Sequence, residues 1–247
     1  MERKAAYVNL AKWFEYLNDD CGYDNWSKYL LEKLRAYDLT DGLDVGCGGG
    51  WFTRAFGRAG YSMTGLDISA EMLDFAQETA SKEGVRGEYL LGDITKFRSP
   101  KKFTFVTAIN DCFNYIPKTK LDGAFKNIRS VLQKDGILLF DISSPRKFRE
   151  KIANTVSVDD RDDVTYFSFN REETDGVTMD VTLFVKRPDG GYERLDETHR
   201  QYLHTEEEIL AALQRNGFTP LCVEGHLGED KNGSDRLVFL ARKGGAK

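Results

Sequence analysis

The sequence is poor in the residues that build disulfide frameworks and metal sites. Its four cysteines lie far apart, no Cys-x-x-Cys pair occurs, and there are only three histidines to help them. Zinc sites and disulfide frameworks are normally marked by clustered or regularly spaced cysteines. We therefore expect no metal site and no disulfide framework.

Excess basic charge and long apolar segments are also lacking. The chain has 35 Lys and Arg against 40 Asp and Glu, a net charge of −5. Non-specific affinity for nucleic acid comes from clustered cations, so this balance argues against an electrostatic nucleic-acid binder, while a local basic groove stays compatible with it. No segment reaches 18 uninterrupted apolar residues, and the first residues lack the apolar run of a signal peptide. We expect a cytoplasmic protein with no membrane segment.

The chain has enough apolar residues for one large core. With 247 residues, 40% of them hydrophobic, it can bury a single core with a modest appendage, but hardly two full independent domains.

Short apolar runs alternate with longer amphipathic stretches from Leu43 onward, which is typical of β-α units and a parallel sheet. One helix is expected from the N-cap Ser69 to Gly84, another at about 119–133, and a third at about 205–216. The expected strands lie near 42–46, 62–66, 86–91, 103–109, 137–142, 218–225 and 235–242.

After Pro145 the pattern changes to long segments of period 2 joined by hairpin turns. Strands are expected at about 164–173, then through 177–186, and at about 192–203, with turns at Asp175-Gly176 and Pro188–Gly191. This predicts a three-stranded antiparallel sheet, inserted after the fifth strand, that caps the site. The acidic run before it, residues 159–163, is expected to be a solvated loop.

The pattern divides the chain into three parts. Residues 1–37 have apolar positions at helical spacing, broken by a polar loop at 18–22, and are expected to form an N-terminal helical lid. Residues 38–145 and 204–247 are expected to form the core, and residues 146–203 the cap.

A glycine-rich segment joins the first core strand to a helix. It reads Leu43-Asp44-Val45-Gly46-Cys47-Gly48-Gly49-Gly50. Glycines there let a ligand approach the free N–H groups of the helix N-terminus. A dinucleotide fold expects the pattern G-x-G-x-x-G, but this segment reads D-x-G-x-G-x-G. When the dinucleotide pattern is aligned to begin at Gly46, Trp51 stands where its last glycine should be. The spacing disfavours nicotinamide binding, and the loop alone is also compatible with a turn that binds nothing.

Polar residues follow the next strands at matching positions. Asp67 ends the second strand, Asp93 follows the third, and Asn110 and Asp111 follow the fourth. Open α/β sheets bind ligands at the carboxyl ends of their strands. The two carboxylate oxygens of Asp67 are expected to accept hydrogen bonds from ribose hydroxyls. The alternative is that Asp67 caps the next helix.

The ordered set Asp44-x-Gly46-x-Gly48-x-Gly50, Gly65-x-Asp67, Gly92-Asp93-Ile94 and Asn110-Asp111 resembles the class I S-adenosylmethionine-dependent methyltransferases. The resemblance covers roughly residues 5–245. Three further segments, Tyr23-x-x-Trp26, 111–115 and 196–199, resemble a branch of small bacterial methyltransferases that is similar in build to glycine and amino-sugar N-methyltransferases.

The resemblance implies a Rossmann-like α/β fold, with a mostly parallel sheet of seven strands and helices on both faces. It also implies S-adenosylmethionine as the methyl donor and S-adenosylhomocysteine as the product. In this resemblance, Gly46 and Gly48 border the methionine part, Asp67 binds the ribose, Asp93 and Ile94 contact adenine, and Asn110 lies beside the sulfonium. The whole expected cofactor set is Asp44, Gly46, Cys47, Gly48, Asp67, Ile68, Met72, Asp93, Ile94, Asn110 and Trp26.

Some of these residues have a second interpretation. Trp26 is expected either in an aromatic lid with Tyr7 and Tyr23 that touches the cofactor, or in the core. Cys47 lacks a basic partner nearby in the sequence, and its position needs a small side chain, so we expect it to be structural and not a nucleophile.

Methyl transfer from a sulfonium depends mainly on proximity and alignment, and a base can remove the acceptor's proton. His199, on the third cap strand, is the first candidate for this base, and a histidine bonded to Glu197 or Asp196 is the alternative. Tyr115 is a second candidate, with packing as its alternative. Asp111 is expected either to bind a substrate amine or lie against the sulfonium, or to cap the Asn114 turn.

The sequence favours methyl transfer to a small-molecule nitrogen or oxygen nucleophile, because the cap predicts a closed pocket and the chain is acidic. Methylation of RNA or protein is the alternative reaction. A sensor that binds S-adenosylmethionine without catalysis is the alternative of another class, because a fold does not fix a function.

Overall fold

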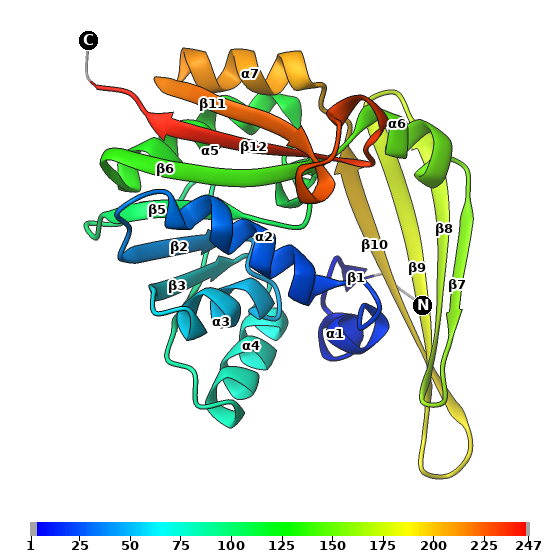
Figure 1. Ribbon diagram of the computed structural model, residues 1–247. Helices are drawn as coiled ribbons and strands as arrows, with labels where there is room; N and C mark the ends of the chain where they lie inside the picture. Colours follow the sequence, from blue (N-terminus) through cyan, green and yellow to red (C-terminus); the bar gives the residue numbers. More distant parts are fainter. Residues whose placement is uncertain (1–3, 246–247) are drawn as a thin grey trace.

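A computed structural model describes residues 4–245 as two sheets with helices around the first (Figure 1). The first sheet has seven strands in the order β11-β12-β6-β5-β2-β3-β4. Its first five strands in sequence run parallel to one another, and β12 is antiparallel to both β6 and β11. The strands are β2 (Asp41–Val45), β3 (Ser62–Asp67), β4 (Glu88–Leu91), β5 (Phe103–Ala108), β6 (Leu132–Ser143), β11 (Phe218–Gly225) and β12 (Arg236–Lys243).

Helices cover both faces of this sheet because its strands are apolar on both sides. In β6, Ile137 and Leu139 pack toward α2 and α3, whereas Leu138 and Phe140 pack toward α5 and α7. The prediction of a mostly parallel α/β sheet with helices on both faces is confirmed. The helices are α2 (Tyr23–Arg35), α3 (Trp51–Arg58), α4 (Ala70–Lys82), α5 (Lys118–Val131) and α7 (Glu206–Arg215).

The helix ends follow from the local sequence. The Ser69 hydroxyl accepts a hydrogen bond from the Met72 N–H and begins α4. A reciprocal capping box between Thr205 and Glu208 begins α7. These ends place the start of α4, and with it Asp67, beside the glycine loop.

A second sheet of five strands stands beside the first, in the order β1-β10-β9-β8-β7 (Figure 1). The strands predicted for the cap are present as β8 (Val164–Glu173), β9 (Gly176–Lys186) and β10 (Tyr192–Tyr202). The predicted number of three strands is wrong. β7 (Val156–Asp160) adds an antiparallel edge strand, and β1 (Lys4–Ala5) adds a parallel pair on the other edge.

The acidic run at residues 159–163 is therefore not only a loop. Asp159 and Asp160 lie in β7, opposite Tyr166 and Thr165 of β8. The run was expected to be a loop because adjacent carboxylates disfavour a buried strand, but an edge strand exposes one face to water.

The helix expected before the break at 18–22 is present only as short turns, whereas the break and the helix after it are present; residues 1–3 lie outside the described part of the chain. Residues 4–22 form β1, a short 3₁₀ turn, α1 (Phe14–Leu17) and turns. α2 is helical but is not a lid, because its apolar stripe of Trp26, Leu30 and Leu34 packs on the seven-stranded sheet. Only the segment before α2 lies between the two sheets (Figure 1).

No helix within residues 4–245 is long and apolar enough to cross a membrane.

Candidate active site

A cavity of about 380 Å³ opens at the carboxyl ends of β2, β3 and β5. This is the edge of the sheet at which open α/β folds bind ligands, and the volume suits a small organic molecule. Every residue expected to hold the cofactor lines this cavity except Trp26: Asp44, Gly46, Cys47, Gly48, Asp67, Ile68, Met72, Asp93, Ile94 and Asn110.

The glycine loop is shaped by residues in left-handed conformation. Gly46 and Gly48 have φ of 65° and 53°, a region that side chains other than glycine rarely occupy. A Cβ atom on Gly46 would lie 2.3 Å from the Cys112 Sγ. The glycines are thus required by the loop itself, and they leave its backbone open toward the cavity.

Asp67 fixes the glycine loop to the end of β3. Its Oδ2 accepts a hydrogen bond from the Gly48 N–H at 2.8 Å, and its Oδ1 accepts one from the Ser69 N–H at 2.9 Å. The cap of α4 is Ser69, so Asp67 is not the capping residue itself. The carboxylate lines the cavity while the backbone N–H groups hold it in place, and its role toward ribose stays a prediction.

Asp44 lies deeper in the loop and is enclosed. Its two oxygens accept hydrogen bonds from the hydroxyls of Thr53 at 2.6 Å and Thr107 at 2.8 Å. Burial raises the pKa of Asp44 to about 6, even though both hydroxyls oppose this shift. Asp44 therefore joins the glycine loop to α3 and β5.

Three residues after β3 and β4, namely Ile68, Asp93 and Ile94, also line the cavity. Ile68 leaves 72% of its surface exposed although it is aliphatic, and Ile94 is buried. Asp93 accepts hydrogen bonds at Oδ1 from both the N–H and the hydroxyl of Thr95. An exposed isoleucine beside an ordered carboxylate suits the face and edge of a planar ring such as adenine.

Cys47 is packed within the loop. Burial raises the pKa of its thiol well above the ordinary value, and the nearby Asp67 and Asp44 raise it further. A nucleophilic cysteine needs the opposite shift, so the geometry agrees with the structural role expected for Cys47.

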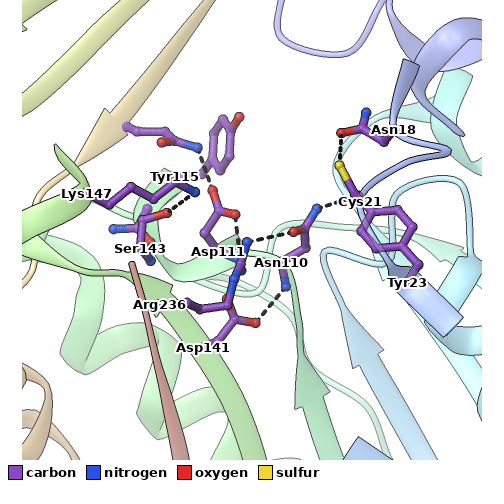
Figure 2. A network of polar contacts seen from close by, with 12 residues as sticks. Asn18, Cys21, Tyr23, Asn110, Asp111, Tyr115, Asp141, Ser143, Lys147 and Arg236 are labelled. Atoms are coloured by element: carbon purple, nitrogen blue, oxygen red, sulfur yellow. Dashed lines mark hydrogen bonds and ion pairs between the residues drawn. The ribbon is translucent and has the colours of Figure 1, made fainter. Parts of the chain in front are cut away.

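The turn after β5 carries Asn110 and Asp111, both with positive φ (65° and 54°). Figure 2 shows what holds this strained turn: the Asp141 carboxylate accepts hydrogen bonds from the N–H groups of both residues, at 2.7 and 2.9 Å. The fully buried Asp141 is paired with Arg236, whose other nitrogen donates to the Asn110 side-chain oxygen at 3.1 Å. The Asn110 amide then donates to the Tyr23 hydroxyl at 3.0 Å.

A second cavity, of about 810 Å³, lies between this turn and the inner face of the five-stranded sheet. Trp26 lies here and not at the first cavity, which does not support its expected contact with the cofactor. Its ring stacks on Tyr29 because α2 packs on the sheet instead of covering the loop. The residues that line both cavities are Tyr7, Phe14, Tyr23, Asn110 and Tyr115.

A chain of hydrogen bonds runs from the five-stranded sheet to the boundary of the two cavities. The His199 Nε2 lies 2.6 Å from the Glu197 Oε1, and the His199 Nδ1 lies 3.2 Å from the Tyr115 hydroxyl. The Tyr115 hydroxyl lies 2.7 Å from that of Tyr7. His199 is bonded to Glu197, as one interpretation expects, and it also lines the second cavity, so its role as a base stays a prediction.

Glu197 anchors both this chain and the N-terminal segment. It is fully buried and also accepts hydrogen bonds from the N–H groups of Tyr7, Asn9 and Leu10. Burial raises the pKa of Glu197, but the bond and charge of His199 together with these N–H groups outweigh it and lower the pKa below its ordinary value. Glu197 therefore stays ionised and favours a proton on the Nε2 of His199.

Asp111 and Gln201 connect the turn to the sheet. The Asp111 Oδ2 accepts a hydrogen bond from the Gln201 amide at 2.7 Å, and its Oδ1 lies 3.4 Å from an Arg236 nitrogen. Asp111 lines the second cavity, as does Gln201.

A buried arginine, Arg54, holds Glu15 and Gly49, two residues that line the first cavity. The Arg54 Nη2 lies 2.8 and 2.9 Å from the two Glu15 oxygens, and its Nη1 donates to the Gly49 carbonyl. This pair fixes α1 to the glycine loop, and Glu15 lines the cavity.

Five residues that line or support the two cavities were not among the candidates from the sequence: Glu15, Arg54, Asp141, Gln201 and Arg236. Asp141 could have been noticed, because it is a lone carboxylate directly after the apolar run at 137–140. The partners of the others lie tens of residues away along the chain, and no local pattern reveals them.

Comparison with known proteins agrees with this geometry. A methyltransferase domain model matches residues 43–136. YqeM of Bacillus subtilis (strain 168), a methyltransferase by name, is 32% identical over 245 residues, which is 96% of this chain and 97% of that protein. The chain belongs to this methyltransferase family. Its methyl donor is S-adenosylmethionine.

Two further relatives of this methyltransferase are informative. The crystal structure of an S-adenosylmethionine-dependent methyltransferase from Clostridium acetobutylicum ATCC 824 superposes with a TM-score of 0.86 at 27% identity, covering 94% of this chain and 96% of that one. A dTDP-3-amino-3,6-dideoxy-alpha-D-glucopyranose N,N-dimethyltransferase from Streptomyces fradiae is 27% identical over 184 residues, covering 72% of this chain and 69% of that protein.

The first cavity fits the donor of this methyltransferase. Glycines that leave the loop backbone open, a carboxylate at the end of β3 and the aliphatic side chains of Ile68 and Ile94 are what a nucleoside with an amino-acid tail requires.

Proposed function

We propose that this methyltransferase acts on a small molecule with a nitrogen or oxygen nucleophile, bound in the cavity under the five-stranded sheet. The observation that carries the proposal is the contact between the two cavities. They meet at Tyr7, Tyr23, Asn110 and Tyr115, so an acceptor in the second cavity lies next to the donor site. Proximity and alignment of this kind are the main requirement of the reaction.

We assign the donor to the first cavity. Gly46 and Gly48 leave room for its amino-acid part, Asp67 is placed to bind the ribose hydroxyls, Asp93 and Ile94 border the base, and Asn110 lies at the junction of the cavities. When bound, S-adenosylmethionine supplies an electrophilic methyl group for in-line attack.

We assign removal of the acceptor's proton to the chain from Tyr7 to Glu197. With a proton on His199 Nε2 facing Glu197, the Nδ1 accepts from Tyr115, and Tyr115 accepts from Tyr7. The Tyr7 oxygen is then left as an acceptor at the junction. A proton from the nucleophile moves onto Tyr7, the Tyr7 proton moves to Tyr115, and the Tyr115 proton moves to His199, where Glu197 stabilises the resulting cation.

We assign Asp111, near the same junction, to binding the acceptor. Its carboxylate lines the acceptor cavity and is held by Gln201. A carboxylate in that place favours an amine over a neutral hydroxyl as the acceptor, because it attracts an ammonium group. The N,N-dimethyltransferase from Streptomyces fradiae named above acts, by its name, on an amino sugar.

Transfer to RNA or protein is the alternative reaction. The five-stranded sheet covers the acceptor cavity (Figure 1), which favours a compact acceptor over a polymer.

The proposal is tested by incubating the protein with methyl-labelled S-adenosylmethionine and fractionated cell extract. We expect label in the low-molecular-weight fraction, and a much lower rate for His199→Ala with donor affinity retained, because His199 takes part only in proton transfer. The expected loss is about 10²- to 10⁴-fold. Label recovered only in RNA or protein would contradict the small-molecule proposal, and an unchanged His199→Ala rate would return His199 to a structural role.

A further inference from the structure

The cationic side chains that line the acceptor cavity differ in whether they form ion pairs. Four cations line it, and three of them have carboxylate partners. Arg236 pairs with Asp141, and Arg146 and Lys151 both lie within ion-pair distance of Asp235.

Lys147 is the exception among the described residues. It ends α6 (Pro145–Lys147), and its Nζ lies 3.2 Å from the Ser143 hydroxyl at the end of β6. No described carboxylate lies within ion-pair distance of it, and Figure 2 shows its side chain reaching toward Tyr115 and Asp111. A half-buried ammonium group at a cavity wall has lost part of its hydration, and Lys147 makes no direct ion pair with Asp111 or with the other carboxylates that line this cavity, Asp159, Glu229 and Asp235.

Unused hydrogen-bonding groups lie at the same cavity. The Trp26 Nε1 and the His226 Nδ1 are buried and have no hydrogen-bond partner within the described residues. The two rings lie 4.6 Å apart and both line the cavity. Buried donors are normally satisfied, so this unpaired indole N–H is an exception.

His226 lies within the electrostatic reach of Lys147. Burial lowers the pKa of His226, and the charges of Arg236 and Lys147 also lower it, while Glu229 and Asp141 oppose this shift. His226 is therefore neutral near pH 7 and carries one N–H. Glu229 is exposed, so water screens its charge more strongly than that of the half-buried Lys147.

We propose that the methyl acceptor carries an anionic group, a carboxylate or a phosphate, that binds to Lys147 beside Ser143. The geometry places this group on the wall formed by α6 and the end of β6, while the nucleophile lies at the junction by Tyr7 and Asp111. The acceptor thus has a negative group, which binds at Lys147, and a nucleophilic group, which lies near Asp111. This inference rests on the proposed acceptor cavity.

A binding experiment tests Lys147 without requiring turnover. The full chain loaded with S-adenosylhomocysteine is titrated with inorganic phosphate, and separately with acetate, at constant ionic strength, and thermal unfolding is followed. Lys147→Met should weaken the affinity for the preferred anion by about 10- to 100-fold, the range for a charge-assisted hydrogen bond. Lys147→Arg should retain most of the affinity.

Lys126→Met is the matched control, because Lys126 is exposed on α5 and lines neither cavity. It should bind both anions as the wild type does. Wild-type affinity in Lys147→Met, or an equal loss in Lys126→Met, would overturn the assignment of Lys147. Absence of stabilisation by either anion would overturn it as well.

A second arm examines the acceptor itself. The extract that takes up label is treated with phosphatase in one sample, and its carboxyl groups are esterified in another. Loss of labelling in one of the two samples identifies the anion, and unchanged labelling in both would contradict an anionic acceptor. If no small molecule is labelled at all, the proposed function fails, and the anion titration still decides whether Lys147 is a binding site.

Discussion

Asp44 and Asp67 both lie at the carboxyl end of a buried strand, yet their partners differ. Both line the cavity, but Asp44 receives two side-chain hydroxyls, whereas Asp67 receives the backbone N–H groups of Gly48 and Ser69. Hydroxyls can rotate to donate or accept, but backbone N–H groups only donate. Burial raises the pKa of both carboxyl groups, and the hydrogen bonds that each accepts oppose this shift.

The raised pKa of Asp44 predicts that this residue contributes to a pH dependence of stability. Its pKa is raised to about 6 in the folded chain by burial, from an ordinary value of 3.8. Between these values the folded state binds more protons than the unfolded state, so the stability contribution of Asp44 falls as pH rises through this window and is constant above it. Asp44→Asn should lack this fall.

The measurement is denaturant unfolding of the wild type and Asp44→Asn at several pH values from 4.5 to 7, a window chosen to span the raised pKa. We expect the wild type to lose stability relative to the variant as pH rises. A difference between the two proteins that does not change with pH would contradict the raised pKa.

Residues at strand ends could be predicted from the sequence, and residues that act through distant partners could not. Asp67, Asp93 and Asn110 follow apolar strands directly, and parallel strands bring their carboxyl ends to one edge. Arg236, by contrast, reaches Asp141 and Asn110 only because β12 pairs antiparallel with β6. That pairing is a property of the complete sheet.

At the scale of elements, the N-terminal segment differs most from expectation. Its apolar spacing is helical, but Glu197 binds the N–H groups of Tyr7, Asn9 and Leu10, and these bonds hold the segment against β10. Tertiary hydrogen bonds outweigh helix propensity here, because a short isolated helix is only marginally stable. The strands of the cap were predictable because their period-2 pattern and hairpin turns are local, whereas the added pairs of β1 and β7 are not.

The pairing of Glu15 with Arg54 predicts how α1 is held over the donor cavity. Glu15→Gln should raise amide hydrogen exchange in residues 11–17 by about tenfold or more, because a charged hydrogen bond contributes ~1.5–3 kcal/mol and local opening follows local stability. Hydrogen exchange read by mass spectrometry measures this directly.

The control for this variant is Glu78→Gln, which removes an exposed carboxylate paired with Lys82 within α4. Exposed pairs stabilise little, so its exchange pattern should match the wild type. Equal protection of residues 11–17 in Glu15→Gln and in the wild type would show that other contacts hold α1.

At the scale of the whole molecule, function depends on how the two sheets meet. The two sheets stand side by side (Figure 1); the first cavity lies at the carboxyl edge of the seven-stranded sheet, and His199 and Gln201 of the five-stranded sheet line the second. The N-terminal segment lies between them and contributes Tyr7 to both cavities. This arrangement supports the proposal that an acceptor held by the five-stranded sheet receives the methyl group.

The most direct test of this account is a crystal structure of the full chain with S-adenosylhomocysteine. We expect the ligand in the cavity lined by Gly46, Gly48 and Asp67, with its ribose hydroxyls bonded to Asp67 and its sulfur facing Asn110 and the cavity under the five-stranded sheet. A sulfur that faces away from that cavity, or a ligand bound outside the glycine loop, would contradict the account.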